Sequence, residues 1–272
     1  MPIPQIRIGS LSVRRLIIGG NPFSGFSHQG AERDIEMLRY YTVGQIKATL
    51  KQAEELGINT FLGRADNHII RMLMEYRDEG GSIQWFAQTC PEMSTILRSI
   101  EDAIAGGAKA CYIHGGVMDY KIANNQIDEI PPAIEAIKEA GLPAGVAGHD
   151  PRVFEWAEKN LDVDFYMCSY YNASHRDENA ELAHDKPEWF LSEDRDIMVN
   201  LIQRLSKPVI HYKILAAGRN DPREAIKFAA GCMRPQDAAC VGVYTKENPN
   251  MLEDDVRLFE TVPGWRIEEV TE

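Results

Sequence analysis

Eight short apolar runs, each ending in polar residues and followed by a helix-like stretch, are the strongest constraint on the fold of this chain. Strands buried on both faces are continuous apolar stretches, and helical crossovers between them imply a parallel sheet. Eight such units in 272 residues match the (β/α)₈ barrel, whose usual length is about 250 residues. We therefore expect one α/β barrel with strands in 16–20, 59–63, 83–89, 110–114, 144–149, 163–169, 208–214 and 239–244.

Residues that close these runs form the candidate site, because such barrels place their chemistry at the carboxyl ends of the strands. Three of the seven histidines close three of the runs. The full set of candidates is Asn21, Arg64, Asp66, Gln88, His114, His149, Asp150, Cys168, Tyr170, Asn172, His211, Lys213, Tyr244 and Glu247.

The composition favours one domain over residues 1–272 and argues against several kinds of partner. A net charge of −12 is unlike that of a nucleic-acid-binding protein, which carries a basic stripe. No apolar stretch approaches the roughly 18 residues of a membrane span, and the first residues lack the apolar core of a secretory signal. Five cysteines without paired spacing predict reduced thiols and a cytoplasmic location. We expect a small-molecule substrate, and a homo-oligomer stays open.

Two long segments that follow strands predict lids over the barrel mouth. They are Phe23–Tyr41 and Ala173–Leu191. Loops of this length are uncommon in compact domains and are often functional. At the opposite end, the runs 5–8 and 11–13 flank Gly9-Ser10 and predict a small hairpin that closes the barrel floor.

Histidines at three strand ends predict a divalent metal site held by His114, His149 and His211. Side chains alternate along a strand, so His211 and Lys213 share a face, which we expect to be the barrel mouth. Neutral imidazoles suit zinc, iron or nickel, with manganese as a further candidate.

Further metal ligands would come from Asp66, Asp150, Cys168 or Glu247. Asp150 is better explained as the cap of a helix that starts at Pro151. For His149, a hydrogen bond to loop backbone is an equally good interpretation.

Lys213 predicts a second kind of chemistry. A lysine in an apolar lumen can act as a base or form a Schiff base, and the alternative is a structural pair with a carboxylate such as Asp66. Arg64 and Arg219 follow strands and suit a carboxylate or phosphate, or a surface salt bridge.

The segment Tyr170-Tyr171-Asn172 offers flat aromatic surface and an amide, as a sugar or a nicotinamide ring requires. Ordinary packing explains the two tyrosines equally well.

Several segments resemble the aldo/keto reductase superfamily of barrels. The segment 57–61 is similar to the family's second strand, 110–114 to its fourth strand with a closing catalytic histidine, and 239–244 with 250–260 to its eighth strand and helix. The resemblance implies carbonyl reduction with NADP by a tetrad of Asp, Tyr, Lys and His.

The chain departs from this family at the chemistry. Leu62-Gly63 replaces the aspartate, Asn67-His68 stands near the place of the tyrosine, and Gln88 replaces the lysine. Only His114 carries over directly, and the basic loop that binds the cofactor phosphate is reduced to Lys246.

Three functions remain open. The first is a metal-dependent isomerase, epimerase or lyase that acts on a small polyhydroxylated substrate, with Lys213, His149 and His114 as catalytic residues. Arg64, Asp66, Gln88 and Asn172 would hold its hydroxyl groups, with Asn21, Tyr170 and Arg219 as further substrate contacts. The second is an NADP-dependent reductase with Tyr170 or Tyr171 stacked on the nicotinamide. The third is a barrel that binds a metabolite without catalysis.

Overall fold

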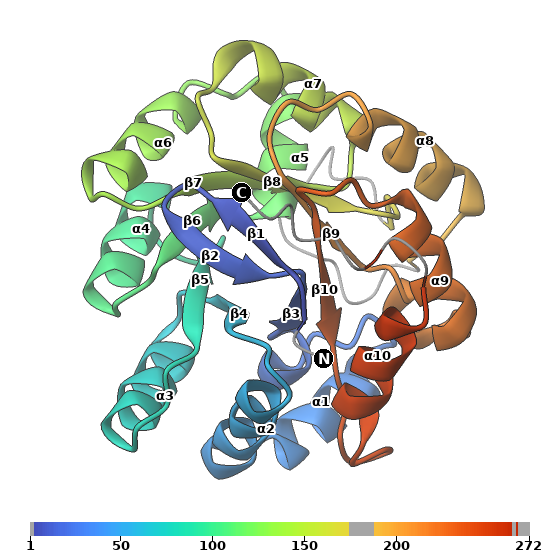
Figure 1. Cartoon of the computed structure of the whole chain (residues 1–272). Helices are drawn as coiled ribbons and strands as arrows, with labels where there is room; N and C mark the ends of the chain where they lie inside the picture. Colours follow the sequence, from blue (N-terminus) through green and yellow to red (C-terminus); the bar gives the residue numbers. More distant parts are fainter. Residues whose placement is uncertain (1–2, 174–187, 263–264, 266–272) are drawn as a thin grey trace, which may run out of the picture.

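The computed structural model describes residues 3–173, 188–262 and 265, and it confirms the predicted (β/α)₈ barrel (Figure 1). Parallel strands close the barrel in the order β10-β3-β4-β5-β6-β7-β8-β9. All eight fall within or next to the predicted apolar runs. They are β3 (Leu16–Gly19), β4 (Thr60–Arg64), β5 (Gln84–Gln88), β6 (Ala110–Ile113), β7 (Ala144–Gly148), β8 (Phe165–Ser169), β9 (Val209–Tyr212) and β10 (Ala238–Gly242).

Helices surround the barrel, and several start where the side chain of a polar residue accepts a hydrogen bond from backbone N–H. Asp66 accepts from Ile69, Asp150 from Arg152, and Asp221 from Arg223 and Glu224. The described helices are α1 (Ala31–Tyr40), α2 (Val43–Glu55), α3 (Asn67–Asp78), α4 (Ile96–Ala105), α5 (Gly115–Ala123), α6 (Ile130–Glu139), α7 (Pro151–Asn160), α8 (Ser192–Ile202), α9 (Pro222–Cys232) and α10 (Met251–Glu260). No helix in the described part of the chain is long and apolar enough to cross a membrane.

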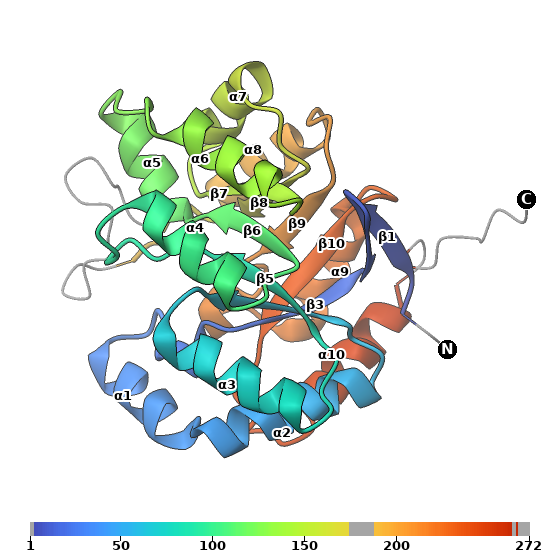
Figure 2. The ribbon, with the colours of Figure 1, turned by 90° about the vertical axis from the view of Figure 1, so that its left-hand side faces the viewer.

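The predicted floor hairpin is present. Strands β1 (Gln5–Ile8) and β2 (Leu11–Arg14) pair antiparallel, and Ile6, Ile8 and Val13 join the same apolar cluster as the lumen residues. Figure 2 shows this hairpin at one end of the barrel and α1 at the other. The floor is therefore closed by side chains, which leaves the opposite end for a site.

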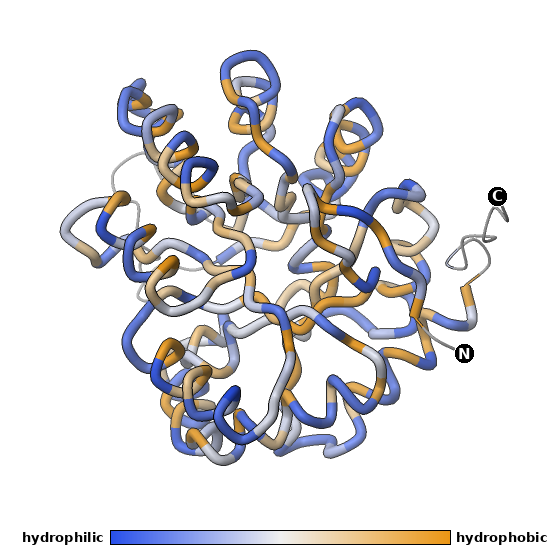
Figure 3. The backbone as a smooth tube through the Cα atoms, turned by 60° about the vertical axis from the view of Figure 1, so that its left-hand side comes forward, coloured by the Kyte–Doolittle hydropathy of each residue, from blue (hydrophilic) through white to orange (hydrophobic). Residues whose placement is uncertain are grey.

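Two apolar layers lie on the two sides of the barrel wall. Phe165 and Met167 belong to the lumen cluster, whereas Tyr166 and Cys168 pack in the cluster that contains the helix residues. The helices match this arrangement, since hydrophobic and hydrophilic residues alternate along them in Figure 3. This inside–outside alternation decides which strand-end residues reach the mouth.

The first predicted lid is not an open loop. It folds as the short 3₁₀ helix η1 (Pro22–Ser24) and as α1, with the connection between them containing His28. Phe23 and Met37 from this segment are buried, so apolar packing against the barrel orders it. Of the second predicted lid, residues 174–187 lie outside the described residues.

Candidate active site at the barrel mouth

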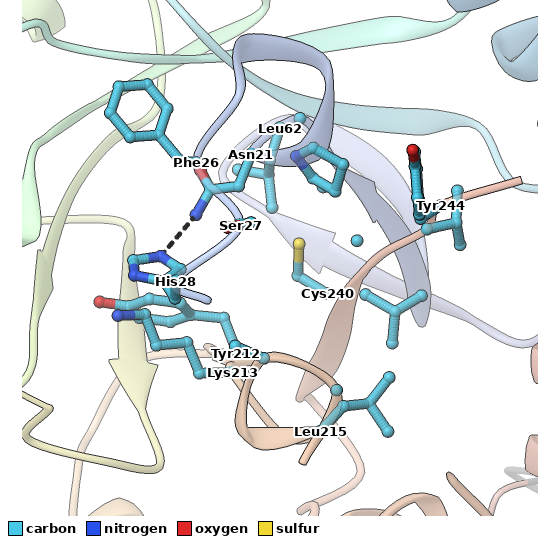
Figure 4. A pocket seen from close by; sticks show the side chains of 18 of the residues that line it. Asn21, Phe26, Ser27, His28, Leu62, Tyr212, Lys213, Leu215, Cys240 and Tyr244 are labelled. Atoms are coloured by element: carbon cyan, nitrogen blue, oxygen red, sulfur yellow. Dashed lines mark hydrogen bonds between the residues drawn. The ribbon is translucent and has the colours of Figure 1, made fainter. Parts of the chain in front are cut away.

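A cavity of about 360 Å³ opens at the carboxyl ends of the strands. Lumen side chains line its depth: Leu62, Tyr112, Ala147, Met167 and Cys240. The predicted site residues that line it are Asn21, Arg64, Gln88, Lys213, Tyr244 and Glu247. Figure 4 shows His28, Tyr212 and Lys213 at one end and Tyr244 at the other, with Cys240 between them.

The register of β9 differs from the prediction. Ile210 lies in the lumen cluster and Tyr212 packs against that cluster, so Tyr212 rather than His211 faces the cavity. Lys213 then breaks the alternation, because its backbone is in the left-handed region with φ 56° and its side chain also lines the cavity. Lys213 thus lies at the barrel mouth as predicted, but through a left-handed backbone rather than through strand alternation.

His211 lies on the outer side of the barrel wall, and the prediction that it faces the mouth is wrong. It is 0% exposed, with Nδ1 3.0 Å from the Tyr170 hydroxyl and Nε2 3.3 Å from Asp237. Burial would raise the pKa of Asp237, but hydrogen bonds and the charges of His211 and Arg234 lower it to about 2. The His211–Asp237 pair is therefore a structural contact on the outer side of the barrel wall.

The three histidines therefore do not form the predicted metal site. Among the residues that the structure describes, no group of three or more His, Cys, Asp or Glu side chains is placed to hold a metal ion. Cys168 is buried on the outer side of β8, where burial raises its thiol pKa well above the usual value. Asp150 caps α7, as the alternative interpretation had it.

Other predicted contacts also lie away from the cavity. Tyr170 is 1% exposed and its hydroxyl faces His211, which contradicts a role in stacking on a ligand. Tyr171 and Arg219 line a separate hollow, where the Arg219 guanidinium donates to the His28 carbonyl oxygen at 2.7 Å. Asn172 is half-buried and is not part of the cavity lining.

Asp66 and Arg64 are hydrogen-bonded to each other at the end of β4. Asp66 accepts from the backbone of Ile69 at 2.9 Å as the cap of α3, and from Arg64 Nε at 3.2 Å. The Arg64 guanidinium also donates to Glu92 and lies 4.9 Å from the centre of the Phe26 ring. Its partners fix the guanidinium where it lines the cavity beside Gln88.

His149 belongs to a buried chain of hydrogen bonds that ends in the cavity. Its Nδ1 lies 2.7 Å from Asp119 Oδ2, and its Nε2 lies 3.3 Å from the hydroxyl of Tyr212. Asp119 Oδ1 accepts from the backbone N–H groups of His149 and Asp150 at 2.9 and 3.1 Å. Since a carboxylate next to Nδ1 favours the proton on that nitrogen, Nε2 is left to accept a hydrogen bond from the Tyr212 hydroxyl, which also donates to the Gly148 carbonyl oxygen at 3.2 Å.

His28 forms a second pair with a carboxylate. Its Nδ1 lies 2.9 Å from Glu188 Oε1, and Nε2 lies 3.4 Å from Nδ2 of Asn21, drawn as the dashed line in Figure 4. An amide nitrogen only donates, so Nε2 accepts and the ring proton lies on Nδ1. Burial would raise the pKa of Glu188, but the hydrogen bond with His28 and the charges of His28, Lys213 and His149 lower it to about 2.

His114 follows β6 and precedes α5, and its backbone N–H donates to Thr89 Oγ1 at 3.0 Å. Its side chain is not part of the cavity lining. His114 thus stands at the sequence position that resembles the histidine of aldo/keto reductases. The imidazole next to Tyr212, however, is that of His149.

Sequence reasoning missed Asp119, Tyr212 and Glu188, and it included His28 only as part of the predicted lid Phe23–Tyr41. Asp119 had a usable signal, since it is an acidic residue inside the apolar stretch Gly115–Ala123. Tyr212 had no usable signal, because each face of β9 carries one apolar and one polar residue.

No family model matches the chain, and no curated protein matches it in sequence. A protein from Pseudomonas aeruginosa assigned as an aldo-keto reductase is similar in structure, with a TM-score of 0.63 at 19% identity over 93% of this chain and 94% of that chain. Truncated 3-deoxy-D-arabino-heptulosonate 7-phosphate synthase from Thermotoga maritima gives 0.56 at 13% identity over 95% and 90%. At these identities the likeness establishes the barrel fold alone.

Proposed function

We propose that the chain is an enzyme that transfers protons at the carbonyl end of a small polyhydroxylated substrate, as an isomerase or epimerase does. One observation carries the proposal: two histidine–carboxylate pairs serve one cavity, one through His28, which lines it, and the other through Tyr212, which lines it and is hydrogen-bonded to His149. Paired imidazoles of fixed tautomer are the usual groups for general acid–base catalysis.

Tyr212 is the acid in this proposal. Its hydroxyl donates a proton to the carbonyl oxygen of the substrate, and the resulting tyrosinate takes a proton back from an enediol hydroxyl as the product carbonyl forms. His149 Nε2, 3.3 Å from this hydroxyl, holds Tyr212 in place. Asp119 keeps the ring proton of His149 on Nδ1, and it is only 5% exposed, so the pair lies in a medium of low dielectric constant.

His28 is the base. Its Nε2 takes the proton from the carbon next to the carbonyl, and Glu188 stabilises the resulting imidazolium through Nδ1. Together the two transfers convert a hydroxy-carbonyl group to an enediol. Return of the proton to the neighbouring carbon completes an isomerisation, and return to the opposite face gives the epimer.

Lys213 stabilises negative charge on the oxygen as the enediol forms. The positive charge of Lys213 contributes to the lowered pKa of Glu188, so the two groups lie within electrostatic range of each other. A charged ammonium is an electrostatic stabiliser rather than a base or a Schiff-base nucleophile. Asn21, Arg64 and Gln88 supply donors for hydroxyl groups along the lining.

The alternative, reduction by NADP, fits these residues less well. Both basic groups at the far end of the cavity are paired with acids: Arg33 with Glu36 and Glu247, and Lys246 with Glu36 at 2.6 Å. A cofactor phosphate would compete with these carboxylates, so we derive no step through the cofactor.

Exchange with heavy water tests the proposal without knowledge of the substrate. The protein is incubated in D₂O with a panel of aldoses and ketoses, and proton NMR follows loss of the signal from the carbon beside the carbonyl. We expect exchange with at least one sugar, and the variant Tyr212→Phe should slow it about 10²–10⁴-fold, the usual contribution of a general acid.

The control is Tyr166→Phe, a buried tyrosine on the outer face of β8, which should leave exchange unchanged. Exchange at the wild-type rate in Tyr212→Phe would contradict the proposal. So would turnover that requires NADPH and shows no exchange, or sugar binding without either reaction.

A further inference from the structure

The far end of the cavity contains a buried carboxyl group without a partner. Asp255 of α10 lines the cavity, is 4% exposed, and its Oδ2 has no hydrogen-bond partner within the described residues. Polar groups so deeply buried are normally hydrogen-bonded, because an unpaired one costs about 1–3 kcal/mol. A carboxyl that borders a cavity and lacks a protein partner therefore indicates a ligand.

Arg33 of α1 presents a second unsatisfied atom on the same lining. Within the described residues its Nε is buried without a partner, although Nη1 and Nη2 pair with Glu36 and Glu247 and the guanidinium lies 4.6 Å from the centre of the Tyr244 ring. The guanidinium is thus held in place with one N–H donor left over. The cavity lining therefore contains a carboxyl oxygen and an N–H donor that each lack a partner.

The charges around this end select the ligand. An anionic group would meet Asp255 and Glu247, and a cationic group would meet Arg33. Met37, Val243 and Met251 complete the lining with apolar surface. A neutral group that both donates and accepts, of which a hydroxyl is the smallest, satisfies both atoms.

We propose that Asp255 and Arg33 form a subsite for the neutral, hydroxylated tail of the substrate, whose carbonyl end lies at Tyr212. This inference rests on the proposed function for the orientation of the substrate. It names the substrate class more narrowly: an open-chain polyol-like molecule with an uncharged far end, long enough to span from Tyr212 past Cys240 to Tyr244 (Figure 4). One tail hydroxyl donates to Asp255 Oδ2, and another accepts from Arg33 Nε.

Binding of D-glucitol, an unreactive polyol, tests this subsite separately from catalysis. Isothermal titration is carried out with the wild type, Asp255→Leu, Asp255→Asn and the control Glu253→Gln, a half-buried residue of the same helix that does not line the cavity. Glycerol is the short probe, since it cannot reach both ends at once. We expect Asp255→Leu to weaken glucitol binding about tenfold, the loss of one hydrogen bond, and to leave glycerol unchanged.

Asp255→Asn should retain glucitol binding to within about threefold, because the amide still accepts and donates. Glu253→Gln should bind as the wild type does. Equal glucitol affinity in Asp255→Leu, or the absence of glucitol binding to the wild type, overturns the subsite. Sugar exchange that depends on Tyr212 would still hold in that case, so failure of the subsite is distinct from failure of the proposed function.

Discussion

The two ends of the cavity differ in how their polar groups are satisfied. At the Tyr212 end, both imidazoles pair with a carboxylate, His149 at 2.7 Å and His28 at 2.9 Å, and only Oε2 of Glu188 in these pairs has no partner among the described residues. At the other end, Asp255 Oδ2 and Arg33 Nε are buried without partners among the described residues. The two imidazoles are therefore oriented before a ligand arrives, whereas Asp255 and Arg33 are completed by one.

This difference has an energetic meaning. Preorganised hydrogen bonds need no rearrangement during the reaction, which is where most of the catalytic advantage of electrostatic groups arises. Unsatisfied groups cost folding stability instead, and the protein recovers that cost on binding. Substitutions at the two ends should therefore act on different quantities: rate at one, stability and affinity at the other.

Asp119→Asn should lower kcat for hydrogen exchange more than any other substitution considered. An amide in place of the carboxylate presents a donor to His149 Nδ1, so the ring proton moves to Nε2 and the Tyr212 hydroxyl loses Nε2 as a hydrogen-bond acceptor. We expect kcat for exchange to fall about 10³–10⁴-fold, as it does when asparagine replaces the aspartate of a catalytic histidine–aspartate pair. The NMR exchange assay measures it.

A third histidine–aspartate pair provides the matched control. His211 and Asp237 are equally buried but lie outside the barrel wall. Asp237→Asn should lower the free energy of unfolding by about 3 kcal/mol, because Arg234 and His211 lose a charged partner, and leave kcat of the folded protein unchanged. A comparable loss of kcat in both variants would show that burial, not the cavity, makes these pairs matter.

Asp255 should make stability depend on pH in the direction opposite to a salt-bridged carboxylate. Burial, with a smaller contribution from Asp254, raises its pKa from 3.8 to about 7. The folded state thus holds this proton longer than the unfolded state, so the contribution of Asp255 to stability is present below about pH 4 and is lost as the pH rises through about 7.

The measurement is urea unfolding of wild type and Asp255→Asn across this pH range. At about 1.4 kcal/mol per pKa unit, the variant should gain up to roughly 4 kcal/mol relative to the wild type between the two ends of the range. A constant difference at all pH values would mean that Asp255 has a partner, and the comparison of the two ends would no longer hold.

Glu188→Gln should lower kcat less than Asp119→Asn does. The pair His28–Glu188 joins two connecting segments, whereas His149–Asp119 joins the end of β7 to α5, so the former tolerates rearrangement better. We expect kcat to fall about 10–100-fold, and the free energy of unfolding to fall by about 3 kcal/mol, because this buried pair loses its charged partner. Glu193→Gln, an exposed neighbour, is the control. A loss as large as that in Asp119→Asn would make the two pairs equivalent.

The sequence predicts the fold well because the barrel depends on patterns that are local. Continuous apolar runs, capping aspartates and the floor hairpin each lie within a few residues. The site is predicted less well, because it depends on which of the two alternating faces of each strand points into the lumen. On β9, Ile210 fits either side of the wall, so nothing in the sequence places Tyr212 in the cavity and His211 outside it.

Partners distant in sequence were also beyond prediction. Asp119 reaches His149 only because α5 packs against β7, and Glu188 reaches His28 across 160 positions. Asn21, Arg64, Gln88 and Lys213 were placed at the cavity from their positions at strand ends. Lys213 lies there through a left-handed backbone that no strand pattern anticipates.

The central claim is that His149 and His28 both carry their proton on Nδ1, with Nε2 of His149 facing the Tyr212 hydroxyl and Nε2 of His28 facing Asn21 at the cavity. Nitrogen-15 NMR of protein labelled at histidine reads the two ring nitrogens of each residue directly at a pH where both rings are neutral. We predict an unprotonated Nε2 in both rings, with the His149 signal shifted in Tyr212→Phe. A proton on Nε2 of either ring in the free protein would contradict the account.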